Sequence, residues 1–220
     1  MNAEFKDRQE AGRQLAAAVV RLGPNEDCVV LALPRGGVPV AVEVARALHA
    51  PLDLLIVRKI GAPGEPELAV AAIAEGDPPT VVVDDRTSRL TGADPAYIER
   101  EAKAQRDEIE RRRQAYRRGL ARPSVAGKTV VIVDDGIATG TTMRAAVQAL
   151  RGLRPARLVL AVPVAAADAM AELSSLVDDV VCLAQPAFFG SVGTYYDDFR
   201  QVDDDEVIAL LDAARTRHEA

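Results

Sequence analysis

Six short apolar segments constrain the fold of this chain more than any other feature of its sequence. Each segment is rich in β-branched residues and continuously apolar, which is typical of strands that are covered on both faces in a parallel sheet. Segments with the spacing of amphipathic helices lie between most of them. This alternation predicts a doubly wound α/β fold, whose ligands bind outside the carboxyl ends of the strands. The apolar segments are CVVLAL (28–33), LDLLIV (52–57), TVVV (80–83), TVVIV (129–133), RLVLAV (157–162) and DVVCL (179–183).

One of the predicted helices is long and strongly charged. It covers 94–119, with Asp94 as its N-cap and Pro95 at its first position. Its apolar residues form one narrow stripe, and acidic and basic residues alternate elsewhere, including the run 111–113 (RRR). This pattern predicts a single docked helix with a solvated face rather than a nucleic-acid-binding surface. The other predicted helices cover 7–22, 38–49, 142–153 and 165–176.

Charge and cysteine content exclude several classes of function. The chain has 27 basic and 33 acidic residues, a net charge of −6, which disfavours a general nucleic-acid or membrane-surface binder. Any anionic ligand must therefore be bound by a local group of residues. Cys28 and Cys182 lie in apolar segments far apart in sequence, as expected of buried thiols in a reducing cytoplasm. The charged N-terminus does not resemble a signal peptide, and no apolar run approaches the ~20 residues of a membrane span. A cytoplasmic location is predicted.

The stretch VVIVDDGIATGTT (130–142) is the most informative about function. Asp134 and Asp135 follow a predicted parallel strand, so they are expected at the ligand-binding edge of the sheet. Carboxylates accept hydrogen bonds from the hydroxyls of a sugar or from the water shell of a cation, and they repel a bare phosphate. The residues that follow supply backbone N–H groups, threonine hydroxyls and a helix N-terminus, all of which suit phosphate. One loop can thus bind both a sugar and its phosphate.

Other interpretations of acidic pairs fit less well. A second pair, Asp84 and Asp85, follows VVV (81–83), but bulkier residues come next, and we interpret it as a strand followed by a turn and a helix cap. A phosphorylatable receiver domain needs a lysine at a later strand end, and the sequence has no lysine after Lys128. Neither G-x-x-x-x-G-K-[ST] nor G-x-G-x-x-G occurs, which excludes the common nucleotide-binding loops.

The stretch 130–142 resembles the phosphoribosyl pyrophosphate (PRPP) signature of type I phosphoribosyltransferases. Ala138 also matches the loop of adenine phosphoribosyltransferases, and over its full length the chain resembles predicted bacterial phosphoribosyltransferases. The resemblance implies a single phosphoribosyltransferase domain over 1–220, with a doubly wound, mostly parallel sheet flanked by helices. The core would cover about 25–183, the helical insertion about 94–120, and a small C-terminal hood about 184–200, followed by a C-terminal helix.

The resemblance also assigns roles to residues. Asp134 and Asp135 would hold the ribose hydroxyls. The departing pyrophosphate would be bound by the loop Arg35-Gly36-Gly37, in which related enzymes have a cis peptide that we expect at Arg35-Gly36, and by Arg58 and Lys59. The 5′-phosphate would be bound by Gly136, Ile137, Ala138, Thr139, Gly140, Thr141 and Thr142.

Catalytic roles are implied for Lys59, Glu65, Asp134 and Asp135. Hypoxanthine/guanine enzymes carry an aspartate where this chain has Ala138, so their general base is missing, and Glu65 or Glu67 in a lid-like connector is the candidate. Mg²⁺ is the implied cofactor, held mainly by PRPP and water near the acid pair, without a metal site made by protein residues alone.

The sequence is less informative about the acceptor substrate. Aromatic residues cluster in the predicted hood, where they either stack on a base or pack the hood's own core; they are Phe188, Phe189, Tyr195 and Tyr196. The implied function is transfer of the 5-phosphoribosyl group of PRPP to a nitrogenous acceptor such as a nucleobase, with release of pyrophosphate, as in nucleotide salvage. The alternative is a non-catalytic PRPP or nucleotide sensor, which would not need Arg58 and Lys59. The implied partners are small molecules, not nucleic acid or membrane, and a homodimer stays open.

Overall fold

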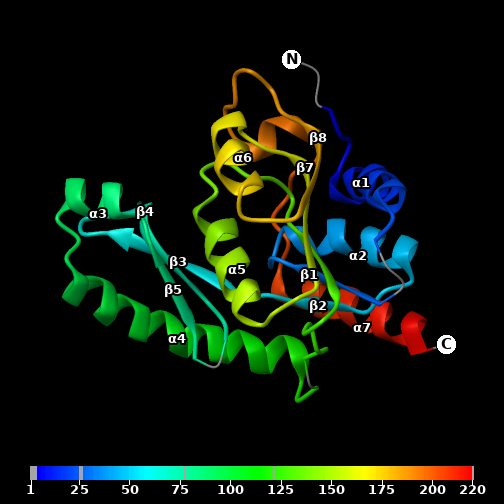
Figure 1. The fold of residues 1–220 in the computed structure, drawn as a ribbon, viewed down its shortest axis with the longest axis horizontal. Helices are drawn as coiled ribbons and strands as arrows, with labels where there is room; N and C mark the ends of the chain where they lie inside the picture. The colour runs from blue at the N-terminus through cyan, green and yellow to red at the C-terminus, as the bar shows by residue number, and fades with distance from the viewer. Residues whose placement is uncertain (1–3, 25–26, 77, 121, 220) are drawn as a thin grey trace. The chain divides into compact units, whose positions relative to one another are not determined.

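The computed structural model describes residues 4–24, 27–76, 78–120 and 122–219 (Figure 1). The chain divides into two compact units. Unit 1 comprises residues 1–54, 121–139 and 154–220, and unit 2 comprises residues 55–120 and 140–153. The expectation of a single domain over 1–220 stays a prediction.

Unit 1 contains a parallel five-stranded sheet in the order β2-β1-β6-β7-β8. Five of the six predicted apolar segments supply its strands, which confirms the α/β fold. In the register, Ala32 is opposite Val133, so β1 and β6 end side by side. The strands are β1 (Cys28–Ala32), β2 (Leu52–Leu54), β6 (Thr129–Val133), β7 (Arg157–Val164) and β8 (Asp179–Ala184).

Helices flank this sheet. The helix α1 (Arg8–Leu22) packs on α2 (Gly37–Leu48), β7 and β8, and α7 (Asp204–Glu219) contacts α2 and β2. The helix α6 (Ala167–Ser174) lies on the opposite face (Figure 1). A short 3₁₀ helix, η1 (Val192–Tyr195), follows β8. The α1 boundary agrees with the sequence prediction: the Asp7 carboxylate accepts from the Glu10 N–H at 2.7 Å, and Gly23 ends the helix in the left-handed conformation.

Unit 2 contains a separate antiparallel sheet, β3-β4-β5. Its strands are β3 (Val57–Ala62), β4 (Glu65–Ala74) and β5 (Thr80–Val83). Two expectations are therefore corrected. The TVVV segment is antiparallel to β4 rather than part of the parallel sheet, and the predicted connector after Lys59 is a β-hairpin with Gly64 in its turn. A continuous apolar run does not reveal whether the neighbouring strand is parallel or antiparallel. The strand β4 begins with charged residues, so the sequence pattern did not identify it as a strand.

Three helices complete unit 2. The helix α4 (Pro95–Arg117) contacts β3 and β4, and α5 (Thr141–Gly152) contacts all three strands. The short helix α3 (Asp85–Thr91) follows β5 directly. The Asp94 carboxylate accepts from the Tyr97 N–H at 2.7 Å, which confirms the predicted N-cap of α4. The arginine run pairs with acidic residues on α4 itself, as expected of a solvated face; the pairs are Arg111 and Arg112 with Glu108, and Arg113 with Glu110.

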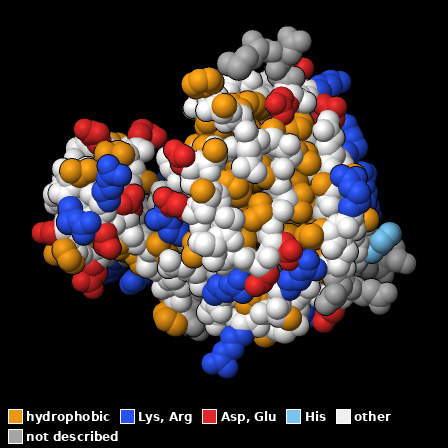
Figure 2. All heavy atoms as spheres, turned by 45° about the horizontal axis from the view of Figure 1, so that its top comes forward, with side chains coloured by type: hydrophobic (Ala, Val, Ile, Leu, Met, Phe, Trp, Pro, Cys, Tyr) orange, Lys and Arg blue, Asp and Glu red, His pale blue; other side chains and the backbone are white. Residues whose placement is uncertain are grey.

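Charged side chains of both signs are interspersed over the face seen in Figure 2. Within the described ranges, none of the helices is both long enough and apolar enough to cross a membrane.

Candidate functional site

The acid pair lies at the carboxyl edge of the unit 1 sheet. Asp134 and Asp135 follow β6 directly, and the N–H of Leu33, just after β1, donates to the Val133 carbonyl at 2.9 Å. The loop that begins at Arg35 continues from Leu33 into α2. Adjacent parallel strands therefore bring the acid pair and the Arg35-Gly36-Gly37 loop to the same edge of the sheet.

Two glycines let this loop lie against the acids. A Cβ on Gly36 would overlap the Asp135 carboxylate, and a Cβ on Gly37 would lie 2.8 Å from the Val133 carbonyl oxygen and 2.9 Å from the Asp134 Cα. A residue larger than glycine would force these groups apart. The peptide bond between Pro34 and Arg35 is cis, one bond earlier than the expected Arg35-Gly36 bond.

Asp135 is bound by Arg8, a residue that the sequence analysis missed. The Arg8 Nε donates to Asp135 Oδ2 at 2.7 Å, and both side chains are largely buried. The Tyr196 hydroxyl donates to the Asp135 carbonyl oxygen at 2.6 Å. Burial raises the pKa of Asp135, and the positive charge of Arg8 acts in the opposite direction. No local sequence pattern could have identified this pair, because its members are 127 positions apart.

The glycine- and threonine-containing loop is anchored at its start. The Ile137 N–H donates to the Val164 carbonyl, and the Ile137 carbonyl accepts from the Ala166 N–H, both at 2.9 Å. The Ile137 side chain is buried, whereas Ala138 and Thr139 are exposed. Ile137 therefore fixes the loop to the end of β7, and the exposed residues after it are the better candidates for direct phosphate contact.

The predicted phosphate loop continues into unit 2. Gly136 to Thr139 belong to unit 1, and Gly140 to Thr142 belong to unit 2. Gly140 has φ +75°, a left-handed conformation that favours glycine, and it forms the N-cap of α5. Thr141 is buried in the first turn of the helix, and Thr142 is partly exposed. A helix N-terminus of this kind presents backbone N–H groups that suit an anion.

Arg58 and Lys59 do not lie on one face of their sheet. They are successive residues of β3, so their side chains point to opposite faces. The Arg58 Nε donates to the Gln105 side chain of α4 at 3.0 Å. Lys59 is exposed and lies opposite Ala72, which packs with Ala145 of α5. The sequence assigned one role to both cations, but only Lys59 lies on the α5 side of the sheet.

The two candidate lid glutamates occupy the start of β4. Glu65 is opposite Ala62, and Glu65 and Glu67 are both exposed. They lie on a hairpin rather than on an irregular loop. Their role as a base stays a prediction.

Most hood aromatics pack on one another. Tyr195 and Tyr196 are buried, Phe189 stacks on Tyr195 with ring centroids 5.5 Å apart, and Phe199 lies 5.0 Å from Tyr196. This arrangement supports the alternative in which these aromatics form the core of the hood. Phe188 is 88% exposed and is the aromatic with a ring face accessible to a base.

The described residues contain no group of three or more histidine, cysteine, aspartate or glutamate side chains arranged to hold a metal ion.

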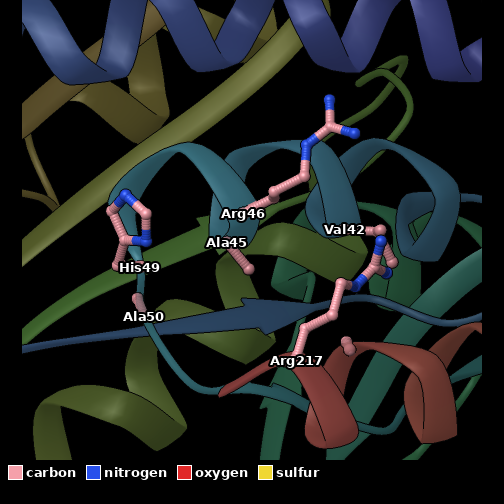
Figure 3. Close-up of a pocket in the computed structure, with 7 residues that line it drawn as sticks. Val42, Ala45, Arg46, His49, Ala50 and Arg217 are labelled. Carbon is pink, nitrogen blue, oxygen red and sulfur yellow. The ribbon is translucent and has the colours of Figure 1, made fainter. Parts of the chain in front are cut away.

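Unit 1 also has a cavity between α2 and α7, whose lining includes Arg46, His49 and Arg217 (Figure 3). This cavity includes neither the acid pair nor the Arg35 loop.

Comparison with known proteins decides the family. The sequence model of the phosphoribosyl transferase domain matches residues 2–198. The chain belongs to the phosphoribosyltransferase family. Two Mycobacterium tuberculosis proteins named "Putative phosphoribosyl transferase", from strains CDC 1551 and H37Rv, are each 49% identical over 210 residues. The match covers 96% of this chain and 47% of theirs, so the chain spans about half the length of these curated relatives.

Solved structures agree on the fold. The crystal structure of TT1426 from Thermus thermophilus is 46% identical, with a TM-score of 0.80 over 94% of this chain and 97% of that chain. AQ2163 from Aquifex aeolicus has a TM-score of 0.50 at 12% identity, over 80% of this chain and 73% of that chain, and shows the fold alone. The fold of TT1426 thus extends over nearly the whole chain.

Proposed function

We propose that this phosphoribosyltransferase transfers the 5-phosphoribosyl group of PRPP to a nitrogenous acceptor, with a nucleobase as the first candidate, and releases pyrophosphate. The single observation that carries the proposal is the contact between the acid pair and the Arg35-Gly36-Gly37 loop at the carboxyl edge of the sheet. Carboxylates for ribose hydroxyls and an arginine with glycine N–H groups for pyrophosphate meet there.

The chemistry explains why these groups belong together. The bond between the anomeric carbon and pyrophosphate breaks, and a bond from the acceptor nitrogen forms, while positive charge develops on the ribose ring. Asp134 and Asp135 stabilise that charge and bind the hydroxyls, and Arg35 together with Lys59 binds the leaving pyrophosphate. An acceptor nitrogen that carries a proton must lose it, and Glu65 is the candidate to accept it.

Mg²⁺ suits this donor set. Asp134 is half-buried, and its carboxylate can accept hydrogen bonds from the water shell of Mg²⁺, but the described residues contain no group of three acidic or other metal-binding side chains. The ion would therefore be held mainly by PRPP and water near the acid pair. When bound, it neutralises charge on the leaving pyrophosphate.

The test is a screen of nucleobases and small amines with PRPP and MgCl₂, with pyrophosphate release as the readout. The proposal predicts that at least one acceptor supports sustained release, and that chelation of the metal stops it. Micromolar binding of PRPP without turnover across the whole panel would instead establish the sensor, which has no use for Lys59.

A further inference from the structure

We propose that Arg8 is a positioning residue for ribose recognition: it holds the Asp135 carboxylate in place as an anion, so that Oδ1 accepts a hydrogen bond from a ribose hydroxyl. This inference rests on the proposed function. It assigns a role to the first turn of α1, which precedes the acid pair by more than a hundred residues.

Arg8 is fixed at three points. Its Nε donates to Asp135 Oδ2 at 2.7 Å, and its Nη1 donates to the Arg200 carbonyl at 2.8 Å. Its guanidinium carbon lies 3.7 Å from the centroid of the Phe199 ring, a cation–π distance. Side-chain exposure is 10% for Arg8 and 13% for Asp135. A planar group with these three partners has little freedom, so it specifies where the carboxylate lies.

Asp135 is confined from a second side. Gly36 packs so closely on the carboxylate that it has no room for a Cβ. The carboxylate therefore lies between Arg8 and the loop assigned to pyrophosphate. Arg8 uses Oδ2, and Oδ1 is the oxygen that we assign to the substrate.

The N-terminal segment holds Arg8 against the hood. The Phe5 N–H donates to the Tyr195 carbonyl at 3.0 Å, and the Asp197 N–H donates to the Phe5 carbonyl at 2.9 Å. The Phe5 and Tyr196 rings have centroids 5.4 Å apart. The start of α1, the residues around Tyr196 and the acid pair thus form one packed network within unit 1.

The positive charge of Arg8 explains its role as the partner of the buried Asp135 carboxylate. The charged and titratable groups that interact with Asp135 or with its neighbour Tyr196 are Arg8 on α1, Asp134 beside it and Tyr196 itself. The Arg35 guanidinium pairs instead with the Asp204 carboxylate, at 3.6 Å. Arg8 is thus the main cationic partner. Without it, burial would act unopposed and raise the pKa of Asp135 further.

The direction in which PRPP affinity changes with pH follows from the ionisation of Asp135. Asp135 accepts hydrogen bonds best when it is ionised, which requires a pH above its pKa in the folded protein. In Arg8→Gln that pKa rises, so PRPP affinity should be lost at a higher pH than in the wild type as the pH falls. It should be regained as the pH rises. Arg8→Lys retains the charge and should keep the wild-type profile, with a smaller loss of affinity because the stacking and the Arg200 contact are weakened.

The experiment is calorimetric titration of Mg²⁺-PRPP between pH 5.5 and 8.5 into the wild type, Arg8→Gln, Arg8→Lys and Arg13→Gln. Arg13 is an exposed residue of the same helix and serves as the matched control. We expect Arg8→Gln to bind at least about tenfold more weakly at pH 7, a loss of ~1.4 kcal/mol. Part of that loss should be recovered at pH 8.5, and Arg13→Gln should match the wild type.

Carboxyl ¹³C NMR of aspartate-labelled protein gives a readout that does not require PRPP. It should show a higher Asp135 pKa in Arg8→Gln than in the wild type and little change in Arg8→Lys. An unchanged Asp135 pKa, or a loss of affinity that is the same at every pH, would overturn the role of Arg8. If Arg8→Gln does not fold, Arg8→Lys decides the question: a pH profile of PRPP affinity that matches the wild type supports the role of the charge, whereas a profile displaced to higher pH contradicts it. A wild type that does not bind PRPP would refute the proposed function instead, while the NMR result still tests the Arg8–Asp135 pair.

Discussion

The chain contains two Val-Asp-Asp segments in which the aspartates directly follow an apolar strand. The two segments have different structural roles. In the first, the Asp84 carboxylate accepts from the N–H groups of Arg86 and Thr87 at 3.1 and 3.0 Å and caps α3. In the second, Asp134 and Asp135 face the Arg35-Gly36-Gly37 loop, and α5 begins only after the intervening loop. The same tripeptide therefore serves as a helix cap in unit 2 and as a candidate ribose site in unit 1.

Two differences around the tripeptide explain this divergence. The strand β5 lies at the edge of an antiparallel sheet, whereas β6 lies in the middle of a parallel sheet, beside a strand that ends at the same level. The first pair leads directly into a helix, whose N–H groups use the Asp84 carboxylate. The second pair is followed by Gly136 and a loop anchored through Ile137, which leaves its carboxylates at the ligand-binding edge.

Apart from removal of the acid pair itself, the largest effect is expected from Gly36→Ala. The new methyl group overlaps the Asp135 carboxylate and must displace it from Arg8. PRPP affinity should fall at least about tenfold, ~1.4 kcal/mol. Gly152→Ala at the end of α5, where a Cβ has open space, is the matched control and should bind normally. Wild-type affinity in Gly36→Ala would show that the close packing has no part in binding.

Lys59→Ala should separate chemistry from binding. The proposed function requires its ammonium group to interact with the leaving pyrophosphate as negative charge accumulates there, so the variant should destabilise the transition state more than the ground state. We expect kcat to fall at least about tenfold, or ~1.4 kcal/mol, with a modest loss of PRPP affinity. Lys103→Ala, at an exposed position of α4, is the control. An equal change in kcat for Lys59→Ala and Lys103→Ala would show that Lys59 has no specific role in the reaction.

Asp84→Ala should affect stability alone. Loss of an N-cap costs about 1 kcal/mol and lowers the melting temperature by about 2–4 °C in a protein of this size. PRPP affinity should stay unchanged, because this carboxylate is used by α3. Thermal unfolding and calorimetry on the same sample check both points, and weaker PRPP binding by the folded variant would contradict the division between the two acid pairs.

The smallest effect is expected from Phe188→Ala. Its exposed ring can stack on a base, and at such a site stacking contributes about 0.7 kcal/mol, so the KM for a base acceptor should rise about threefold. Phe189→Ala should instead lower the melting temperature, because this ring packs on Tyr195. Steady-state kinetics with the identified acceptor compares Phe188→Ala with the wild type. An unchanged KM in Phe188→Ala would show that this ring does not bind the acceptor.

Periodicity and capping residues allowed much of this fold to be predicted. The parallel strands, α1 and the capped start of α4 all depend on local patterns, as does the interpretation of Asp84 as a cap. The antiparallel placement of β5 was not predictable, because an apolar run does not identify its neighbours. The contrast between Arg58 and Lys59 depends on the missed hairpin, and Arg8 is brought to Asp135 only by the tertiary fold.

Calorimetric titration of Mg²⁺-PRPP into three proteins tests the central claim most directly. They are the wild type, the double variant Asp134→Asn with Asp135→Asn, and the double variant Asp84→Asn with Asp85→Asn. Each carboxylate that binds a ribose hydroxyl should contribute about 1.5–3 kcal/mol, so the first double variant should lose at least about 100-fold in affinity. The second should bind as the wild type does. Equal affinity in all three proteins, or a greater loss at Asp84 and Asp85, would contradict the assignment of the ribose site to Asp134 and Asp135.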